Sequence, residues 1–228
     1  MSQISQLQFP GQAAAPDGPV DFVNMYAFHF AFRRDLARFA EVVPRTAPDD
    51  VAAWRLLSER WDLFAGQLHH HHEAEDRVLW PWLRTRVSAG ELAVLDLMQL
   101  EHEAIDPVLT RIAKAFAALA GGDPSARAGL GAALADASAV LGEHLAHEET
   151  ESLAIMQRVM TDAQWKELEA QFRVGQPPTA VLTMVPWVLS GLPDADRAAL
   201  LRRAPKALGL LARLLSPRFE RRERRCFG

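Results

Sequence analysis

Two nine-residue stretches correspond to each other at a fixed distance along the chain: LHHHHEAED at 68–76 and LGEHLAHEE at 141–149. Both begin with leucine and end with an acidic residue, and both contain a histidine followed four residues later by a glutamate. In the run of four histidines, only the third has a histidine opposite it in the second stretch, so the repeat selects His71. Internal repetition of this kind indicates two equivalent structural halves.

The repeat also includes an earlier histidine in each half, 42 residues before the histidine that is followed by glutamate. Six residues are therefore duplicated at an offset of 73: His29, His71, Glu75, His102, His144 and Glu148. Side chains at positions i and i+4 of a helix lie about 40° apart and project from one face. Imidazoles and carboxylates buried in a bundle need compensation, and nitrogen and oxygen ligands without thiolates suit iron, manganese or zinc. Two carboxylates and two pairs of histidines predict a dinuclear metal centre.

The remaining sequence predicts an all-α protein. Leucine, alanine, arginine and glutamate dominate, tyrosine occurs once, and runs of β-branched residues are absent, which favours helix throughout. Prolines and capping signals bound four long helices, predicted at 20–43, 49–87, 88–121 and 123–160. Long helices with short connections predict an up-down-up-down four-helix bundle with additional C-terminal helices.

The flanks of this bundle are less regular. We expect a flexible N-terminal arm at 1–18, the bundle at 19–160, a helical extension at 161–217 packed on or beside it, and a basic tail at 218–228. The tail contains five arginines, but the glutamates between them favour a solvated segment over a nucleic-acid or lipid contact. The extension is expected either to cover one flank of the bundle or to mediate a dimer.

Composition and charge limit the classes of function. Hydrophobic residues make up 49% of the chain, enough to bury a sizeable core, and the net charge of −4 argues against a nucleic-acid binder. Cys226 is the only cysteine, which excludes an intramolecular disulfide and a cysteine-based metal site. The N-terminus lacks a secretory pattern and no apolar stretch reaches about 18 residues without a charge. We therefore expect a cytoplasmic protein without membrane contact.

The six duplicated residues resemble the ligand pattern of the hemerythrin-like (HHE cation-binding) family over about residues 20–160. The flanking stretches EDRVLWP at 75–81 and LEHEAIDP at 100–107 resemble those of its bacterial, particularly actinobacterial, members. This resemblance implies a four-helix bundle around a non-haem di-iron site. It implies that His29 and His71 serve one iron and that the second-half pair serves the other. Both glutamates would bridge the ions, together with an oxo or hydroxo group, and manganese or zinc could substitute for iron.

The pattern departs from that of oxygen-carrying hemerythrin, which has His-x3-His on the third helix and His-x4-Asp on the fourth. Here the third helix offers His102 and, four residues later, Asp106, so one histidine is missing. Open coordination positions suit dioxygen, hydrogen peroxide or nitric oxide, and we expect a catalase-like oxidoreductase. The alternative is a non-enzymatic module that binds or senses oxygen, iron or nitric oxide. A ferritin-like oxidase is set aside, because no glutamate has a histidine three residues later.

Residues near the duplicated set are candidates for additional ligands or for hydrogen bonds to ligand imidazoles. Tyr26 should share the face of His29, as a phenolate ligand, a hydrogen-bond donor or a packed core residue. His72 borders the inward face of its helix and is either a seventh ligand or a neighbour of the ligands. The other candidates for metal contact or for orienting an imidazole are Glu101, Asp106, His147 and Glu151. His69 and His70 are expected to face solvent.

Overall fold

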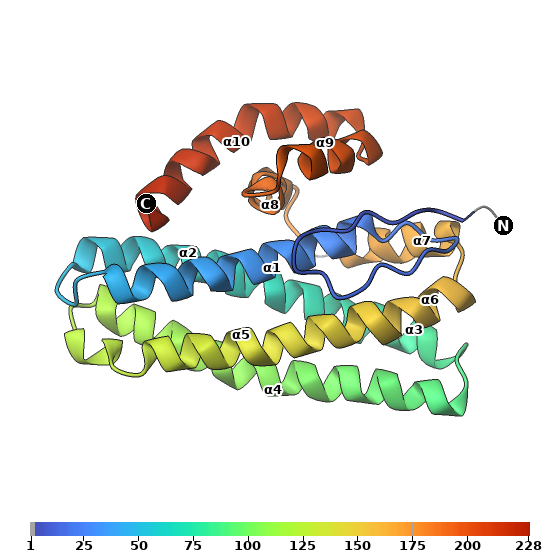
Figure 1. Cartoon of the computed structure of the whole chain (residues 1–228), viewed down its shortest axis with the longest axis horizontal. Helices are drawn as coiled ribbons and strands as arrows, with labels where there is room; N and C mark the ends of the chain where they lie inside the picture. The colour runs from blue at the N-terminus through green and yellow to red at the C-terminus, as the bar shows by residue number, and fades with distance from the viewer. Residues whose placement is uncertain (1–2, 175) are drawn as a thin grey trace.

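The computed structural model describes residues 3–174 and 176–228, and the regular elements within these ranges are helical. Four long rods lie side by side as a bundle (Figure 1). In chain order their α-helices are α1 (Val23–Val42), α2 and α3 (Val51–Ala74 and Trp80–Arg84), α4 (Ala89–Ala120), and α5 and α6 (Leu130–His147 and Leu153–Val159). The predicted all-α fold is confirmed.

Large apolar side chains fill the interior of the bundle. On α2, Trp54, Trp61 and Phe64 are fully buried, at spacings that place them on one side of the helix. Phe39 of α1 and Phe116 of α4 pack against Trp61, with ring centroids 5.2 Å and 5.5 Å away. This aromatic cluster lies along the N-terminal half of α2 and leaves the histidines to the C-terminal end of that helix.

Two rods change to a π-helical turn at the same place in the repeat. The turn η2 (Glu75–Leu79) follows α2, and the turn η4 (Glu148–Ser152) follows α5. Both turns begin at the duplicated glutamate and are related by the offset of 73 residues. Because π-turns within α-helices are often found at functional sites, this duplication marks the same region as the histidines.

The fourth rod begins later than the sequence predicts. Asp123 caps a short 3-10 turn, η3 (Pro124–Arg127), by accepting a hydrogen bond from the Ser125 amide at 3.0 Å. The α-helix starts only after Gly129, whose left-handed φ of 83° interrupts the helical path. By contrast, α4 begins near its predicted start, with a capping box formed by Ser88 and Glu91.

The described N-terminal residues 3–18 lie against the bundle, which differs from the flexible arm expected there. Phe9 is buried and packs against Phe30 of α1, with ring centroids 6.3 Å apart. The backbone amide of Ala13 donates a hydrogen bond to Glu149 Oε2 at 2.7 Å. A segment without helical or strand periodicity is ordered here by contacts with distant residues.

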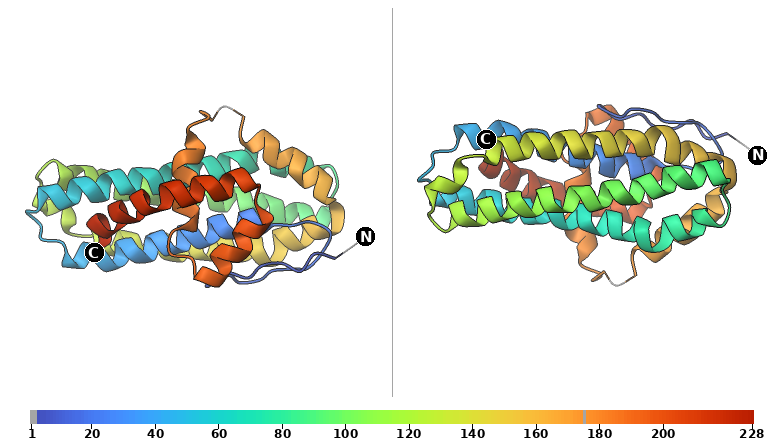
Figure 2. Two further views of the ribbon diagram at one scale, coloured as in Figure 1. Left: turned by 90° about the horizontal axis from the view of Figure 1, so that it is seen from above. Right: turned by 90° about the horizontal axis from the view of Figure 1, so that it is seen from below.

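In the described part of the chain, four helices follow the bundle and cover one of its sides. They are α7 (Asp162–Phe172), α8 (Ala180–Leu189), α9 (Asp194–Arg203) and α10 (Lys206–Phe227). α8 lies between α10 and the bundle and crosses the long axis, whereas α10 runs along it (Figures 1 and 2). None of the helices in the described ranges has the length and apolar character needed to cross a membrane.

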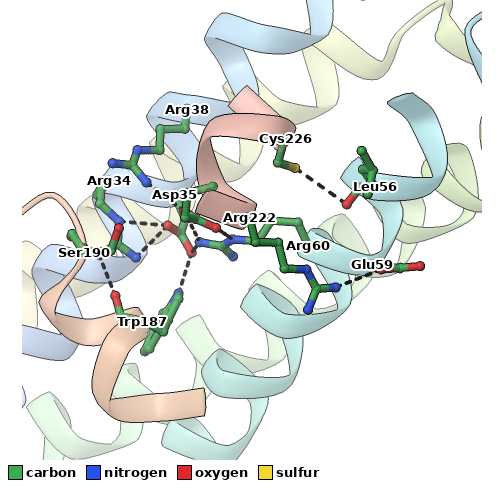
Figure 3. A network of polar contacts seen from close by, with 11 residues as sticks. Arg34, Asp35, Arg38, Leu56, Glu59, Arg60, Trp187, Ser190, Arg222 and Cys226 are labelled. Carbon is green, nitrogen blue, oxygen red and sulfur yellow. Dashed lines mark hydrogen bonds and ion pairs between the residues drawn. The ribbon is translucent and has the colours of Figure 1, made fainter. Parts of the chain in front are cut away.

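A buried network of charges joins α10 to the bundle (Figure 3). Asp35 of α1 is fully buried and accepts hydrogen bonds from Arg60 of α2 at 2.7 Å and from the Trp187 indole of α8 at 2.8 Å. Arg60 also donates to Glu223 of α10 at 2.6 Å. The predicted basic tail at 218–228 is therefore the end of a helix that packs on the bundle, because one of its glutamates pairs inward.

Candidate metal centre

Nine buried side-chain atoms lie together where the four rods meet and have no hydrogen-bond partner among the described residues outside this cluster. They are the Nε2 atoms of five histidines and both carboxylate oxygens of two glutamates: His29, His71, His72, His102, His144, Glu75 and Glu148. An unpaired buried polar atom costs roughly 1–3 kcal/mol. So many in one place indicate that the residues are arranged to hold a bound group.

Six of these side chains form two groups, and within each group the donor atoms lie within 4.8 Å of one another. One group is His29, His71 and Glu148, and the other is His72, His102 and His144. Glu75 lies between them, with Oε1 3.1 Å from His71 Nε2 and Oε2 3.5 Å from His102 Nε2. Each oxygen of Glu75 faces a different group, which is the placement that a carboxylate bridging two cations requires. The structure thus brings all six duplicated residues together.

His72 adds a fifth histidine, one more than the repeat selects. Its side chain is buried, and its ring stacks on that of His102, with centroids 4.0 Å apart and planes 10° apart. The equivalent residue in the second half is Leu145, so a search by symmetry misses it. The sequence nevertheless named His72 as a possible seventh ligand from its position after His71, and consecutive residues of a helix point about 100° apart, so they can serve two neighbouring cations.

Two histidines that are related by the repeat each contact a carboxylate through Nδ1, the ring nitrogen that points away from the centre. His29 Nδ1 lies 2.8 Å from Glu149, and His102 Nδ1 lies 2.9 Å from Asp76. Glu149 and Asp76 are themselves related by the 73-residue offset, so each half supplies the acid that contacts the other half's histidine. A proton held on Nδ1 leaves the Nε2 lone pair facing inward, as metal-binding histidines require.

The other acidic and histidine candidates lie outside both groups. Glu101 pairs with the Nδ1 atoms of His144 and His147, at 2.9 Å each, and so orients one of the inward imidazoles from behind. His147 directs its Nε2 toward Glu151, 3.7 Å away, which is exposed. Asp106 is also exposed. The geometry therefore gives Glu101 an orienting role and places Asp106 and Glu151 at the surface.

The buried glutamates and histidines of the site have shifted pKa values. Burial and Glu148 raise the pKa of Glu75 well above its usual value. Burial also opposes ionisation of Glu148, but the histidines around it, His29 foremost, together outweigh burial and lower the pKa of Glu148 to about 2. Burial and neighbouring imidazoles hold the pKa of His71 and His72 well below the usual value, so both are neutral. A neutral imidazole can bind a metal ion through its free nitrogen. Two adjacent buried carboxylates ionise together only where positive charge lies beside them. The residues of the site therefore fit a pair of cations.

A cavity of about 230 Å³ opens onto one side of the site. Its inner end includes His71, Glu75 and Phe28, and the Phe28 ring stacks on that of His71 with centroids 5.8 Å apart. The group that contains His72 contributes none of the described residues that line the cavity. The two groups therefore differ in access, and the one with two histidines is the accessible one.

Tyr26 and His70 have surroundings unlike those of the inward histidines. Tyr26 is fully buried in the core, and burial, Glu149 and Glu148 raise the pKa of its hydroxyl above the usual value, so it remains a neutral phenol. It belongs to neither group of donor atoms in the described chain. His69 is exposed as predicted, but His70 is half-buried and lines the cavity.

The comparison with protein families agrees with this geometry. Residues 21–155 match the family model described as the hemerythrin HHE cation binding domain. The matched part contains all seven inward side chains and ends before the four C-terminal helices. A search of curated proteins and a search of solved structures each found no match. Because the match covers more than half of the chain, this protein belongs to the hemerythrin HHE cation-binding family.

Proposed function

We propose that this protein holds two non-haem iron ions and binds a small ligand at them. The observation that carries the proposal is the convergence of nine unpaired buried nitrogen and oxygen atoms among the described residues. The ions would be held by the five inward histidines, with Glu75 and Glu148 shared between them. The same donors would accept manganese or zinc, because the set contains no thiolate. The family match supports a cation-binding bundle.

A bound pair of iron ions would supply redox chemistry and an open coordination position for a small molecule. The two groups of donor atoms are unequal, because one contains three histidines and the other contains only two, His29 and His71. The side with fewer histidines is also the side that faces the cavity. We infer that dioxygen, nitric oxide or hydrogen peroxide approaches the centre there.

Apolar side chains around the site restrict the entry of water. Phe28 and Phe32 contact the His71 ring, with centroids 5.8 Å and 5.3 Å away. The Trp80 ring lies beside that of His102 in the other group, with centroids 6.3 Å apart. A dry site strengthens the interaction between ligands and cations, because little solvent is present to screen it.

The fifth histidine alters the balance between two candidate functions. Four histidines would leave open positions on both ions, which is the basis for expecting catalase-like turnover of peroxide. Five histidines restrict the opening to the side of His29 and His71, which favours reversible binding of dioxygen or nitric oxide. Peroxide turnover is the second candidate, supported by the cavity of about 230 Å³ that reaches His71 and Glu75, which is larger than a peroxide molecule.

Metal analysis of untagged protein tests the centre itself. We expect about two metal ions per chain by mass spectrometry, with iron predominant. A metal content well below one ion per chain after growth in iron-rich medium would contradict the proposal.

Reaction with dioxygen and peroxide distinguishes the two functions. Reduced, iron-loaded protein that develops a visible charge-transfer band with dioxygen, and loses the band under vacuum, acts as a reversible binder. Rapid oxidation of the iron together with sustained oxygen evolution from hydrogen peroxide would instead support turnover.

A further inference from the structure

The cavity beside His71 has two walls, and only one belongs to the part of the chain that matches the family. On the bundle side, α1 and α2 contribute Ala27, Phe28 and Ala74. On the other side, the C-terminal helices contribute Trp165, Val185, Val188, Leu201 and Leu208. Because the family match ends at residue 155, the extension encloses a space that the bundle alone would leave open to solvent.

The size of the cavity selects a small organic molecule. Its volume of about 230 Å³ exceeds the roughly 150 Å³ of an apolar cavity that binds benzene. It is smaller than the roughly 300 Å³ at which pockets for drug-sized ligands begin. One molecule of about the size of a substituted benzene ring therefore fits, and a peptide segment or a nucleotide does not.

The lining selects an uncharged molecule. Aliphatic and aromatic side chains form most of the walls, and of the two glutamates there Glu75 faces the two groups of donor atoms whereas Glu169 has partners of its own. Glu169 accepts a hydrogen bond from Asn24 at 2.9 Å and interacts with the charge of Arg173. An ionised ligand would be desolvated without a free counter-charge, whereas an apolar or hydroxyl-bearing ligand would lose little.

We propose that this cavity binds one small uncharged organic molecule, aromatic or branched aliphatic, with the inner end of the molecule against His71 and Glu75. The molecule would lie between solvent and the two-histidine side of the centre, where it would restrict the entry of small ligands. Binding in the cavity needs no metal. Only the effect on ligand entry rests on the proposed function.

Binding of phenol, toluene and indole to the full-length protein tests the proposal. Calorimetry and ligand-observed NMR are performed on the protein as purified and after metal removal, and we expect one bound molecule per chain in both forms. Val188→Phe and Ala204→Leu add bulk at two separate positions of the wall and should weaken binding about tenfold or more. Leu182→Phe is the matched control on the same helix as Val188, because Leu182 is 42% exposed and lies outside the lining.

Azide provides a second readout in the iron-loaded protein. Saturating phenol should weaken azide binding in the natural sequence and have little effect in Val188→Phe. Azide affinity that phenol leaves unchanged would contradict the placement beside His71. Absence of probe binding, or an equal loss of probe affinity in Leu182→Phe and Val188→Phe, would overturn the proposal. Neither outcome would contradict an iron-loaded centre. Protein that lacks iron but binds the probes in a Val188-dependent way would preserve the cavity site and refute the proposed function.

Discussion

At the level of single residues, neighbours in the sequence have different tasks in the candidate centre. His71 and His72 belong to different groups of donor atoms, although they are adjacent on α2. Glu75 faces both groups, while Asp76 contacts His102 from behind. A helix turns by about 100° per residue, so adjacent side chains can serve two cations that lie side by side. In the run of four histidines, His71 and His72 therefore point inward, whereas His69 is exposed and His70 lines the cavity.

Alanine at position 72 tests whether the fifth histidine is a ligand. His72→Ala removes one of three nitrogens from its group, and we expect the bound iron of untagged protein to fall by about half. His69→Ala is the control from the same run, since His69 is exposed, and its iron content should equal that of the natural sequence. Equal iron content in the two variants would exclude His72 as a ligand.

Glutamine at position 149 tests the acid behind His29. Glu149 contacts His29 Nδ1 at 2.8 Å and accepts two hydrogen bonds from Arg33, at 2.6 Å and 3.0 Å. Glu149→Gln removes the charge that orients the imidazole, so metal affinity measured by competition with a chelator should fall about 10- to 100-fold. Glu151→Gln, at a side chain that is 56% exposed, should leave the affinity unchanged. Retained affinity in Glu149→Gln would show that the acid does not support the centre.

At the level of helices, buried ion pairs determine where the C-terminal extension lies. Arg60 of α2 connects Asp35 of α1 with Glu223 of α10, and Trp187 of α8 donates to the same aspartate. Arg38 of α1 adds a second contact to Glu223 at 2.8 Å. Since α8 carries part of the cavity wall, this network also positions the residues that face His71.

Removal of Arg60 tests the importance of this connection. Arg60→Ala leaves two buried carboxylates without their shared partner, and the free energy of unfolding in urea should fall by about 3–5 kcal/mol. Arg222→Ala is the matched control on α10, because Arg222 and its partner Glu59 are both exposed. That exposed pair should contribute about 0–1 kcal/mol. Similar losses in the two variants would contradict a dominant role for the buried network.

At the level of the whole molecule, a symmetric repeat is converted into an asymmetric site. The two halves supply equivalent histidines and glutamates, but His72 has no counterpart and the extension covers only one side. One group is thereby enclosed while the other meets a cavity. Binding and entry of a small ligand are expected to occur at one side of the centre only.

Metal removal tests how far the centre stabilises the whole fold. A ligand at about 1,000 times its Kd stabilises the native state by about 4 kcal/mol, so iron-loaded protein should have a higher Tm than protein treated with dithionite and a chelator. Scanning calorimetry measures the difference. In His29→Ala, which lacks an inward histidine, chelation should change the Tm less. Identical Tm values for loaded and metal-free natural protein would indicate that the bundle gains nothing from the ions.

The sequence by itself determined the helical class, the bundle and the six duplicated residues that converge in the structure. Caps, prolines and helical periodicity act over a few residues, so they can be recognised locally. The repeat made the convergence of distant residues recognisable, because two equivalent halves must present equivalent side chains to a shared centre.

Only the tertiary structure decided which features break that symmetry. His72 corresponds to Leu145 in the repeat, so the sequence left two roles open for it, and the packing of the helices places its side chain beside the other inward histidines. The contact of Ala13 with Glu149 spans 136 residues, and the cavity needs helices that follow the matched domain. Such features depend on which surfaces, distant in the sequence, bury each other. The free energy of that burial depends on the whole fold, so no local stretch of sequence can reveal it.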